Sequence, residues 1–315
     1  MDCEGVEATV FPEAQAGSEE DPIVCRFTFR SALGICTAIP VSLYADPRGE
    51  QRPSEKGCGS KGAMKIDAIL SPAEFGMLAD RDLRATTCVV FDILRATTCM
   101  AAAIHNGAQG ILPVLEIEDA MRAKREHPDA LLAGERGGLR IRAAQTGRGD
   151  FDLGNSPREF TRERVMGRKI ITTTTNGTRA LESCKGSSGV FAGAYVNLGA
   201  TLQAVLEVQP EQLLVVCSGT GELLALEDVI VAGRFLLEFE RLRGGQANLS
   251  DSARALMGCA SSIGVDLKQA FSGSSNGARL LGMTDLGGDV SYAASRDIHP
   301  VAVRRNAHGW LVQQT

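Results

Sequence analysis

The stretch from Val89 to Thr98 reads VVFDILRATT, and it predicts a buried β-strand that passes directly into a helix. The apolar run Val89–Phe91 is short and rich in β-branched and aromatic residues, which favours a strand. Asp92 follows at the strand end, and Arg95 and two threonines follow within one turn of the chain. An acid, a guanidinium and two hydroxyls are therefore expected in one strand-to-helix turn.

The pattern around this stretch predicts the fold class. After Cys99–His105, which we expect to be helical, Asn106 and Gly107 supply a helix stop signal. From Met64 onward, short apolar runs alternate with helical patterns in the same way. This alternation predicts an α/β fold with three layers, in which a mixed, mostly parallel sheet carries helices on both faces.

Four further apolar runs also end in polar clusters. The expected strands are residues 130–133, 151–153, 170–171 and 212–217, and they are followed by GERGG (134–138), GNSPRE (154–159), TTTTNGTR (172–179) and SGTG (218–221). Glu227 and Asp228 then open an apolar helix. In open α/β sheets, ligands bind beyond the carboxyl ends of the strands, so we expect these clusters to share one edge and to form one site.

Each cluster also has an ordinary structural explanation. Asp92 could cap a helix, the threonine run could be a plain strand, and Arg136 could belong to a surface ion pair. The threonine run and its Asn-Gly turn, however, place hydroxyls and free backbone N–H groups where a phosphate would bind. The coincidence of several such clusters favours a site.

The overall charge limits the class of ligand. The 315-residue chain has a net charge of −5 and a pI near 5.5, so it has no general attraction for nucleic acid or anionic lipid. An anionic ligand must be held by local arginines and is expected to be small. Because the chain has neither a membrane-length apolar run nor a signal-peptide pattern at its start, we expect a cytoplasmic protein that does not contact membranes.

The nine cysteines indicate neither a zinc site nor a disulfide framework. Their number is odd, they are scattered, and no C-x-x-C pair occurs. We interpret them as reduced thiols, and Cys88, Cys99 and Cys217, which lie in apolar runs, as small buried hydrophobic residues. The four histidines are likewise scattered and do not suggest a metal centre.

The ordered set of motifs resembles one known family. DILRAT (92–97), GERGG (134–138), DLGNSP (152–157), TTTNGTRAL (173–181) and the EDV segment from Glu227 are together similar to the 2-phosphosulfolactate phosphatase family, as are SNGARLL (275–281) and the segment from Asp289 to Asp297. The resemblance runs from Met64 to about Arg304. It implies Mg²⁺-dependent hydrolysis of 2-phospho-3-sulfolactate to 3-sulfolactate and phosphate, a step on one route to coenzyme M.

The resemblance and the residue chemistry together suggest roles. The expected catalytic residues are Asp92, Arg95, Glu135 and Asp228, and the expected substrate-binding residues are Thr97, Arg136, Asn155, Thr174, Asn176, Thr178 and Arg179, with Arg158 as a further cation. The expected Mg²⁺ ligands are Asp92 and Asp228, with Glu227 and Glu135 in reserve. Whether water or a carboxylate attacks phosphorus is left open.

The same reading defines the domains and the alternatives. Residues 1–63 have no counterpart in the family and are expected to be a poorly ordered N-terminal extension, or else a regulatory or lid segment, whereas residues 64–315 are expected to form the phosphatase domain. A homodimer is compatible with the sequence. The alternative functions are a phosphatase for a related phosphorylated 2-hydroxy acid and a non-catalytic anion-binding protein on the same fold.

Overall fold

The structure is a computed structural model that describes residues 24–27, 39–42, 63–245, 247–263 and 266–314. The chain divides into two units between Ser60 and Lys61. In the first unit, β1 (Val24–Phe27) and β2 (Ile39–Ser42) pair as antiparallel strands. The rest of the expected N-terminal extension, up to position 62, lies outside the described residues, so its poor order stays a prediction.

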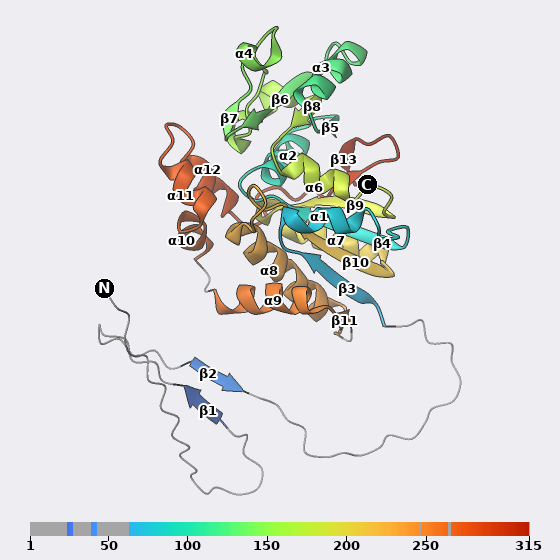
Figure 1. Cartoon of the computed structure of the whole chain (residues 1–315), viewed down its shortest axis with the longest axis vertical. Coiled ribbons are helices and arrows are strands. Elements are labelled where there is room, and N and C mark those ends of the chain that lie inside the picture. Colours follow the sequence, from blue (N-terminus) through green and yellow to red (C-terminus); the bar gives the residue numbers. More distant parts are fainter. Residues whose placement is uncertain (1–23, 28–38, 43–62, 246, 264–265, 315) are drawn as a thin grey trace, which may run out of the picture. The chain divides into compact units, whose positions relative to one another are not determined.

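The second unit is built on a sheet of eleven strands (Figure 1). The strands are β3 (Lys65–Ile69), β4 (Thr86–Phe91), β5 (Gly110–Pro113), β6 (Leu131–Arg136), β7 (Leu139–Arg140), β8 (Lys169–Thr173), β9 (Gly189–Gly193), β10 (Gln212–Cys217), β11 (Asn248–Leu249), β12 (Val303–Arg305) and β13 (Leu311–Gln313). Their order is β11-β3-β10-β4-β9-β12-β13-β5-β8-β6-β7. This mixed, mostly parallel sheet confirms the predicted fold class.

The sheet contains two parallel groups joined by the β12–β13 hairpin. One group is β11-β3-β10-β4-β9 and the other is β5-β8-β6. The pairings of β9 with β12, β12 with β13, and β13 with β5 are all antiparallel, so the two groups run in opposite directions along the sheet. In a flat sheet their carboxyl ends would lie at opposite edges, which differs from the single edge expected from the sequence.

The segments that follow the two groups nevertheless meet. Arg95, which follows β4, donates from Nη2 to the carbonyl of Gly138, which follows β6, at 2.6 Å. In Figure 1, β5, β6 and β8 lie with α3 and α4 above the other strands. The candidate residues are therefore brought together across the junction of two strand groups.

Helices cover both faces of the sheet. They are η1 (Pro72–Glu74), α1 (Phe75–Leu78), α2 (Ala96–His105), α3 (Ile117–Glu126), α4 (Ala143–Thr146), η2 (Pro157–Glu159), α5 (Arg162–Val165), α6 (Gly177–Ser183), η3 (Tyr195–Asn197), α7 (Leu198–Val208), α8 (Leu226–Leu242), α9 (Asp251–Ser262), α10 (Leu267–Ser272), α11 (Ser275–Leu281) and α12 (Gly288–Ala293). Helix α2 begins three residues before the expected start at Cys99 and is capped by Asn106 as expected.

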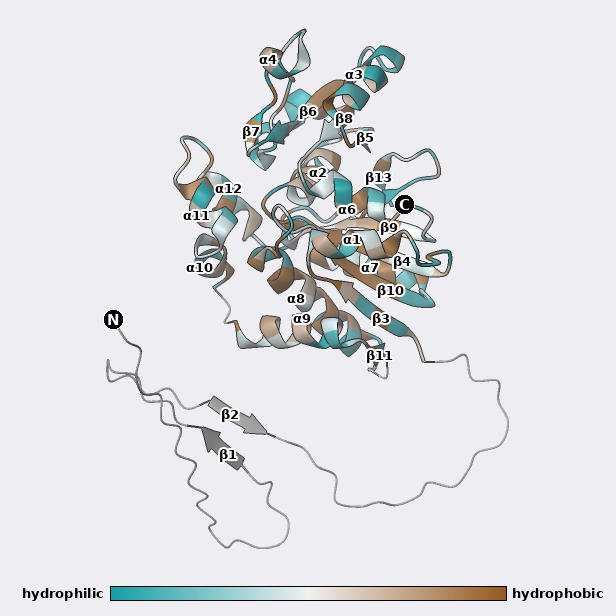
Figure 2. Cartoon of the chain, in the orientation of Figure 1, coloured by the Kyte–Doolittle hydropathy of each residue, from teal (hydrophilic) through white to brown (hydrophobic). Residues whose placement is uncertain are grey.

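The strand residues alternate between two cores, as the two-residue repeat of a strand requires. On β4, Val89 and Phe91 pack into the core that includes α7, α8 and α9, whereas Cys88 and Val90 pack into the core that includes α1, α2 and α6. Phe91 lies 5.6 Å from Phe235 of α8, measured between ring centroids. Figure 2 shows hydrophobic residues concentrated on the strands and on the helices packed against them.

The expected strand at residues 151–153 is not formed. It is reduced to a single bridge between Ala133 and Leu153. Asp152 Oδ2 accepts the backbone N–H of Leu132 at 2.8 Å, so a side chain takes the hydrogen bond that a strand partner would accept. The local sequence favours a strand, but the polar side chain of Asp152 replaces part of the ladder.

The expectation for the thiols holds among the described residues. Cys88, Cys99 and Cys217 are buried, and the five cysteines of the second unit are free. In the same part of the chain, the helices are too short or too polar to cross a bilayer.

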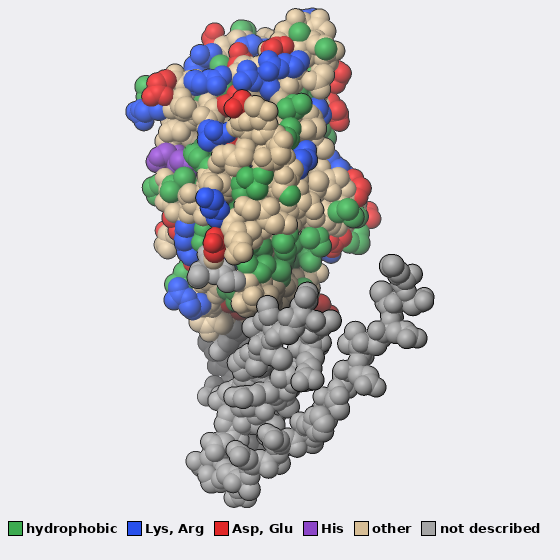
Figure 3. Space-filling view, turned by 90° about the vertical axis from the view of Figure 1, so that its left-hand side faces the viewer, with side chains coloured by type: hydrophobic (Ala, Val, Ile, Leu, Met, Phe, Trp, Pro, Cys, Tyr) green, Lys and Arg blue, Asp and Glu red, His purple; other side chains and the backbone are tan. Residues whose placement is uncertain are grey.

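Charged side chains of both signs gather at one end of the second unit. On the face drawn in Figure 3, Lys and Arg side chains cluster toward the upper end, where Asp and Glu side chains lie among them. The upper part of the chain in Figure 1 contains β7 and α4, and it includes the ion pairs Arg142–Asp150 and Arg140–Glu159. Arg142 and Arg140 are therefore each paired with a neighbouring acid.

Candidate active site

A cavity of about 150 Å³ lies where the two strand groups meet. It is lined by Asp92, Leu94, Arg95, Glu135, Gly137, Gly138, Asn155, Thr174, Thr175, Asn176, Gly219, Thr220, Gly221, Asn276 and Arg279. These residues come from the end of β6 and the turn after it, from the segments after β4, β8 and β10, from the loop before η2, and from α11. A cavity of this size suits a small ligand, since drug-sized ligands occupy about 300 Å³ or more.

Asp92 is buried at the end of β4, with its Oδ1 fixed by the start of α2. Oδ1 accepts the backbone N–H of Ala96 at 2.9 Å, and the Thr97 hydroxyl lies 2.9 Å from both the N and the O of the Asp92 backbone. Burial is the main cause that raises the pKa of Asp92 to about 7; the nearby charges of Glu135 and Glu227 act in the same direction, and backbone donors oppose the shift. Asp92 can therefore exchange a proton near neutral pH.

Asp228, in the first turn of α8, ties two loops of the site together. Its Oδ1 accepts the N–H of Ile93 at 2.8 Å, and its Oδ2 accepts the N–H of Gly219 at 3.0 Å. Burial raises the pKa of Asp228 well above its ordinary value, and the charges of Asp92 and Glu227 act in the same direction. The two aspartates therefore share a region that favours a proton or a cation.

Glu135 has a similar holding role on the other strand group. Its Oε1 accepts the N–H of Thr175 at 2.8 Å, and its Oε2 accepts the N–H of Gly138 at 2.6 Å. The carboxylate thus fastens the β6–β7 turn to the loop after β8.

Three buried oxygens around the cavity accept no hydrogen bond from the described residues. They are Asn176 Oδ1, Ser218 Oγ and Glu227 Oε2. Their neighbours are satisfied, because Asn176 Nδ2 donates to the carbonyls of Ser218 and Gly221, and Glu227 Oε1 accepts from Asn276 at 2.7 Å. Unpaired buried acceptors require a donor or a cation.

The carboxylate and amide oxygens around the cavity are chemically compatible with Mg²⁺. Among the described residues, no three His, Cys, Asp or Glu side chains converge on one metal position. Mg²⁺ needs only one or two carboxylates, because it completes its shell with water and substrate oxygens. Asp92 and Glu227 with the amide oxygen of Asn176 meet that requirement.

Two guanidinium groups line the cavity. Arg95 is buried, and its Nη1 pairs with Asp289 Oδ2 at 2.9 Å. Arg279, on α11, is exposed and lies beside Gly138, where a Cβ would be 3.1 Å from its Nη1. One cation is therefore fixed inside the cavity and the other stands at its rim.

The structure places the other expected residues in different positions. Asn155, Thr174 and Asn176 line the cavity, together with Asp92, Arg95 and Glu135. Thr97 and Thr178 instead bond to neighbouring backbone groups.

The remaining expected arginines do not line the cavity. Arg136 donates to the carbonyl of Leu115 and to Thr173, Arg179 pairs with Glu222 at 3.0 Å, and Arg158 pairs with Asp289 at 2.8 Å. Their roles in substrate binding stay predictions.

Three residues of the site have no role in the sequence prediction. Asn276 and Arg279 line the cavity from α11, and Asp289 of α12 is fully buried against Arg95. The segment SNGARLL contains the first two and resembles the family, but nothing in its local pattern indicates that it returns to the strand ends.

Several known protein sequences similar to this chain share one family name. A model of the 2-phosphosulpholactate phosphatase family matches residues 77–306. A protein of Thermotoga petrophila named "probable 2-phosphosulfolactate phosphatase" is 33% identical over 233 residues, which are 74% of this chain and 92% of that protein. A protein with the same name from Clostridium novyi is 33% identical over 236 residues, 75% of this chain and 94% of its own length.

A third relative with this name, from a Synechococcus species, is 36% identical over 239 residues, with 74% of this chain and 93% of its own length covered. The match of the family model includes all the residues that line the cavity. The chain therefore belongs to the 2-phosphosulpholactate phosphatase family.

Proposed function

We propose that this protein hydrolyses 2-phospho-3-sulfolactate to 3-sulfolactate and phosphate with the help of Mg²⁺. The observation that carries the proposal is one small cavity that combines the buried acid Asp92 with the guanidinium groups of Arg95 and Arg279. Membership of the family and the names of its relatives support the choice of substrate. The resemblance to the family further supports a coenzyme M-type sulfonate route and a cytoplasmic setting as part of the proposal.

The cations suit the substrate because it carries phosphate, carboxylate and sulfonate. Guanidinium groups donate paired hydrogen bonds to such planar and tetrahedral anions. Arg95 is held by Asp289 and by the carbonyl of Gly138, so it meets the substrate in a fixed orientation. Arg279 has an exposed side chain and can close on the anion that lies farther out.

Asp92, Glu227 and Asn176 would hold the Mg²⁺. Asp228 lies close enough to Asp92 and Glu227 for their charges to act on it. When bound, the metal supplies positive charge that stabilises the phosphoryl oxygens during displacement. The unpaired oxygens of Glu227 and Asn176 support this assignment.

Asp92 is the proposed reactive carboxylate. Its carboxylate lines the cavity, where it is placed to take a proton from attacking water or to return one to the leaving oxygen. We favour water as the attacking group, because the D-x-D pattern of a large class of covalent phosphatases is absent and Leu94 stands two positions after Asp92.

A phosphate-release panel tests the proposal. The full-length protein is assayed with 2-phosphosulfolactate, 2-phospholactate and phosphoglycerate, each with Mg²⁺ and with excess chelator. We expect kcat/KM for 2-phosphosulfolactate to exceed the others by at least about tenfold, the scale of one charge-assisted contact, and the chelator to abolish release.

The other outcomes point to the alternative functions. Equal or faster release from 2-phospholactate would identify a phosphatase for a related 2-hydroxy acid. No release from any ester would indicate a non-catalytic anion-binding protein.

A further inference from the structure

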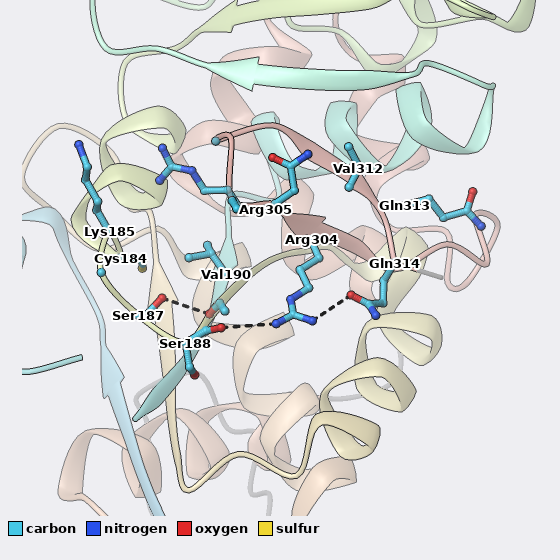
Figure 4. A pocket seen from close by; sticks show the side chains of 15 residues that line it. Cys184, Lys185, Ser187, Ser188, Val190, Arg304, Arg305, Val312, Gln313 and Gln314 are labelled. Carbon is cyan, nitrogen blue, oxygen red and sulfur yellow. Dashed lines mark hydrogen bonds between the residues drawn. The ribbon is translucent and has the colours of Figure 1, made fainter. Parts of the chain in front are cut away.

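A second and larger cavity, of about 790 Å³, lies between the loop that joins α6 to β9 and the β12–β13 hairpin (Figure 4). Gly189, the first residue of β9, is among its lining residues and pairs in parallel with Thr87 near the start of β4. The active-site cavity follows the carboxyl end of β4. The second cavity, which we call the hairpin groove, is therefore at the opposite end of this strand pair.

The lining of the hairpin groove is basic. It contains Lys185, Arg304 and Arg305 and no carboxylate side chain. Glu182, next to the groove, pairs with Lys185 at 3.0 Å and with Arg305 at 3.0 Å. One acid set against three cations leaves positive charge in the groove, although the whole chain has a net charge of −5.

Arg304 is the cation best placed to receive an anion. Its Nη1 donates to Gln314 Oε1 at 3.2 Å, its Nη2 lies 3.4 Å from the carbonyl of Ser188, and its guanidinium stands 5.4 Å from the ring centroid of Phe191. None of the ion pairs formed among the described residues includes Arg304. Figure 4 shows its guanidinium between Ser188 and Gln314.

The orientation of Arg304 is therefore set by neutral acceptors. Its full charge and its remaining N–H groups stay available, which is the arrangement that favours a planar or tetrahedral anion.

The other lining groups suit a polar ligand. Ser187, Ser188, Asn306 and Gln313 line the groove together with the cations. The volume lies within the range of small-molecule sites, about 300 to 1,000 Å³. Because the charge is confined to one groove and does not extend as a stripe, a small ligand fits it better than a nucleic acid.

We propose that the hairpin groove is a second anion-binding site, which takes a small ligand carrying a phosphate-type dianion. Arg304 provides the principal contact, and Lys185 and Arg305 provide the surrounding positive field. The site is separate from the active-site cavity, with which it shares no lining residue.

Binding of methylenediphosphonate, a bisphosphonate with no hydrolysable P–O–P bond, tests the proposal on the full-length protein without added metal. Isothermal titration calorimetry gives both the Kd and the stoichiometry. We expect saturable binding whose Kd rises at least about tenfold in Arg304→Gln, the scale of a lost charge-assisted hydrogen bond. The side chain of Lys185 is 76% exposed, so Lys185→Gln should not impair folding. We expect this variant to raise the Kd by about threefold.

Two matched variants locate the binding. Arg148→Gln removes an exposed arginine outside both cavities, and Arg279→Gln removes a cation of the active-site cavity. Binding at the groove predicts an unchanged Kd in both. The proposal would be overturned if no saturable binding occurred, or if Arg148→Gln raised the Kd as much as Arg304→Gln. It would also be overturned if binding were lost in Arg279→Gln and kept in Arg304→Gln and Lys185→Gln. Circular dichroism confirms that each variant is folded.

Discussion

Arg95 and Asp289 lie 194 positions apart in the chain and form a buried ion pair, with Arg95 Nη1 2.9 Å from Asp289 Oδ2. The two side chains are 4% and 0% exposed. Asp289 Oδ1 also accepts from Ser156 at 2.6 Å and from Arg158 at 2.8 Å. A helix near the end of the chain therefore fixes the cation that stands inside the active-site cavity.

Replacing Asp289 with Asn should affect both stability and substrate binding. The change leaves Arg95 buried without its counter-charge, and the loss of one partner of a buried pair costs about 3 to 5 kcal/mol. We expect the free energy of unfolding, measured by urea denaturation, to fall on this scale and KM to rise at least about tenfold. Asp82→Asn, at an exposed pair with Arg84, is the control and should change neither quantity.

Gly177 supplies space that Asp92 needs. A Cβ at position 177 would lie 2.6 Å from Asp92 Oδ2 and 2.6 Å from the Cβ of Ala96. Gly177→Ala should therefore displace the carboxylate, lower kcat by at least about tenfold and destabilise the fold by about 1 to 3 kcal/mol. Gly258→Ala, in α9 with no atom within 4 Å, should keep full activity. Equal kcat in the two variants would argue against a reactive role for Asp92.

The arginines at positions 279 and 179 give a matched comparison. Arg279 lines the cavity, whereas Arg179 pairs with Glu222 at 3.0 Å in an exposed position. Arg279→Gln should raise the KM for 2-phosphosulfolactate at least about tenfold, and Arg179→Gln should change it less than about twofold. The reverse result in steady-state kinetics would restore the substrate-binding role that the sequence suggests for Arg179.

His299 makes stability depend on pH. Burial, together with the charge of His105, lowers the pKa of His299 from 6.5 to about 4, and its Nε2 lies 2.6 Å from the hydroxyl of Tyr292. In the unfolded chain the imidazole of His299 takes up a proton near pH 6.5, whereas in the folded protein it does so only near pH 4. The contribution of neutral His299 to the free energy of unfolding is therefore complete above pH 6.5 and is lost as the pH falls from 6.5 through 4.

Urea denaturation at a series of pH values measures this dependence. The loss should be on the order of 1 to 2 kcal/mol, since the site is only partly shielded from solvent. His299→Gln should flatten the pH dependence relative to the unchanged protein. An identical slope in both proteins would contradict the assignment.

Polar residues at the strand ends could be predicted from the sequence, because a short apolar run followed directly by Asp, Arg or Thr is visible within a few residues of the chain. Asp92, Glu135, Asn155 and Asn176 are brought together as expected. The reversal between the two strand groups was not predictable, because the β12–β13 hairpin that causes it lies far along the chain from both.

Side-chain direction accounts for the other differences. Glu135 lines the cavity, but the next residue, Arg136, points to Leu115 and Thr173, since neighbouring strand residues face opposite sides. Asn276, Arg279 and Asp289 lie on short helices with no strand before them. Only the tertiary packing of α11 and α12 brings them to the site.

Phosphate release from 2-phosphosulfolactate, compared between the full-length protein and its Asp92→Asn variant in one preparation with Mg²⁺, tests the central claim most directly. The unchanged protein should release phosphate, and the variant should do so at least about 100-fold more slowly while unfolding at a similar urea concentration. Release at equal rates from both proteins, or from neither, would contradict an active site built around Asp92.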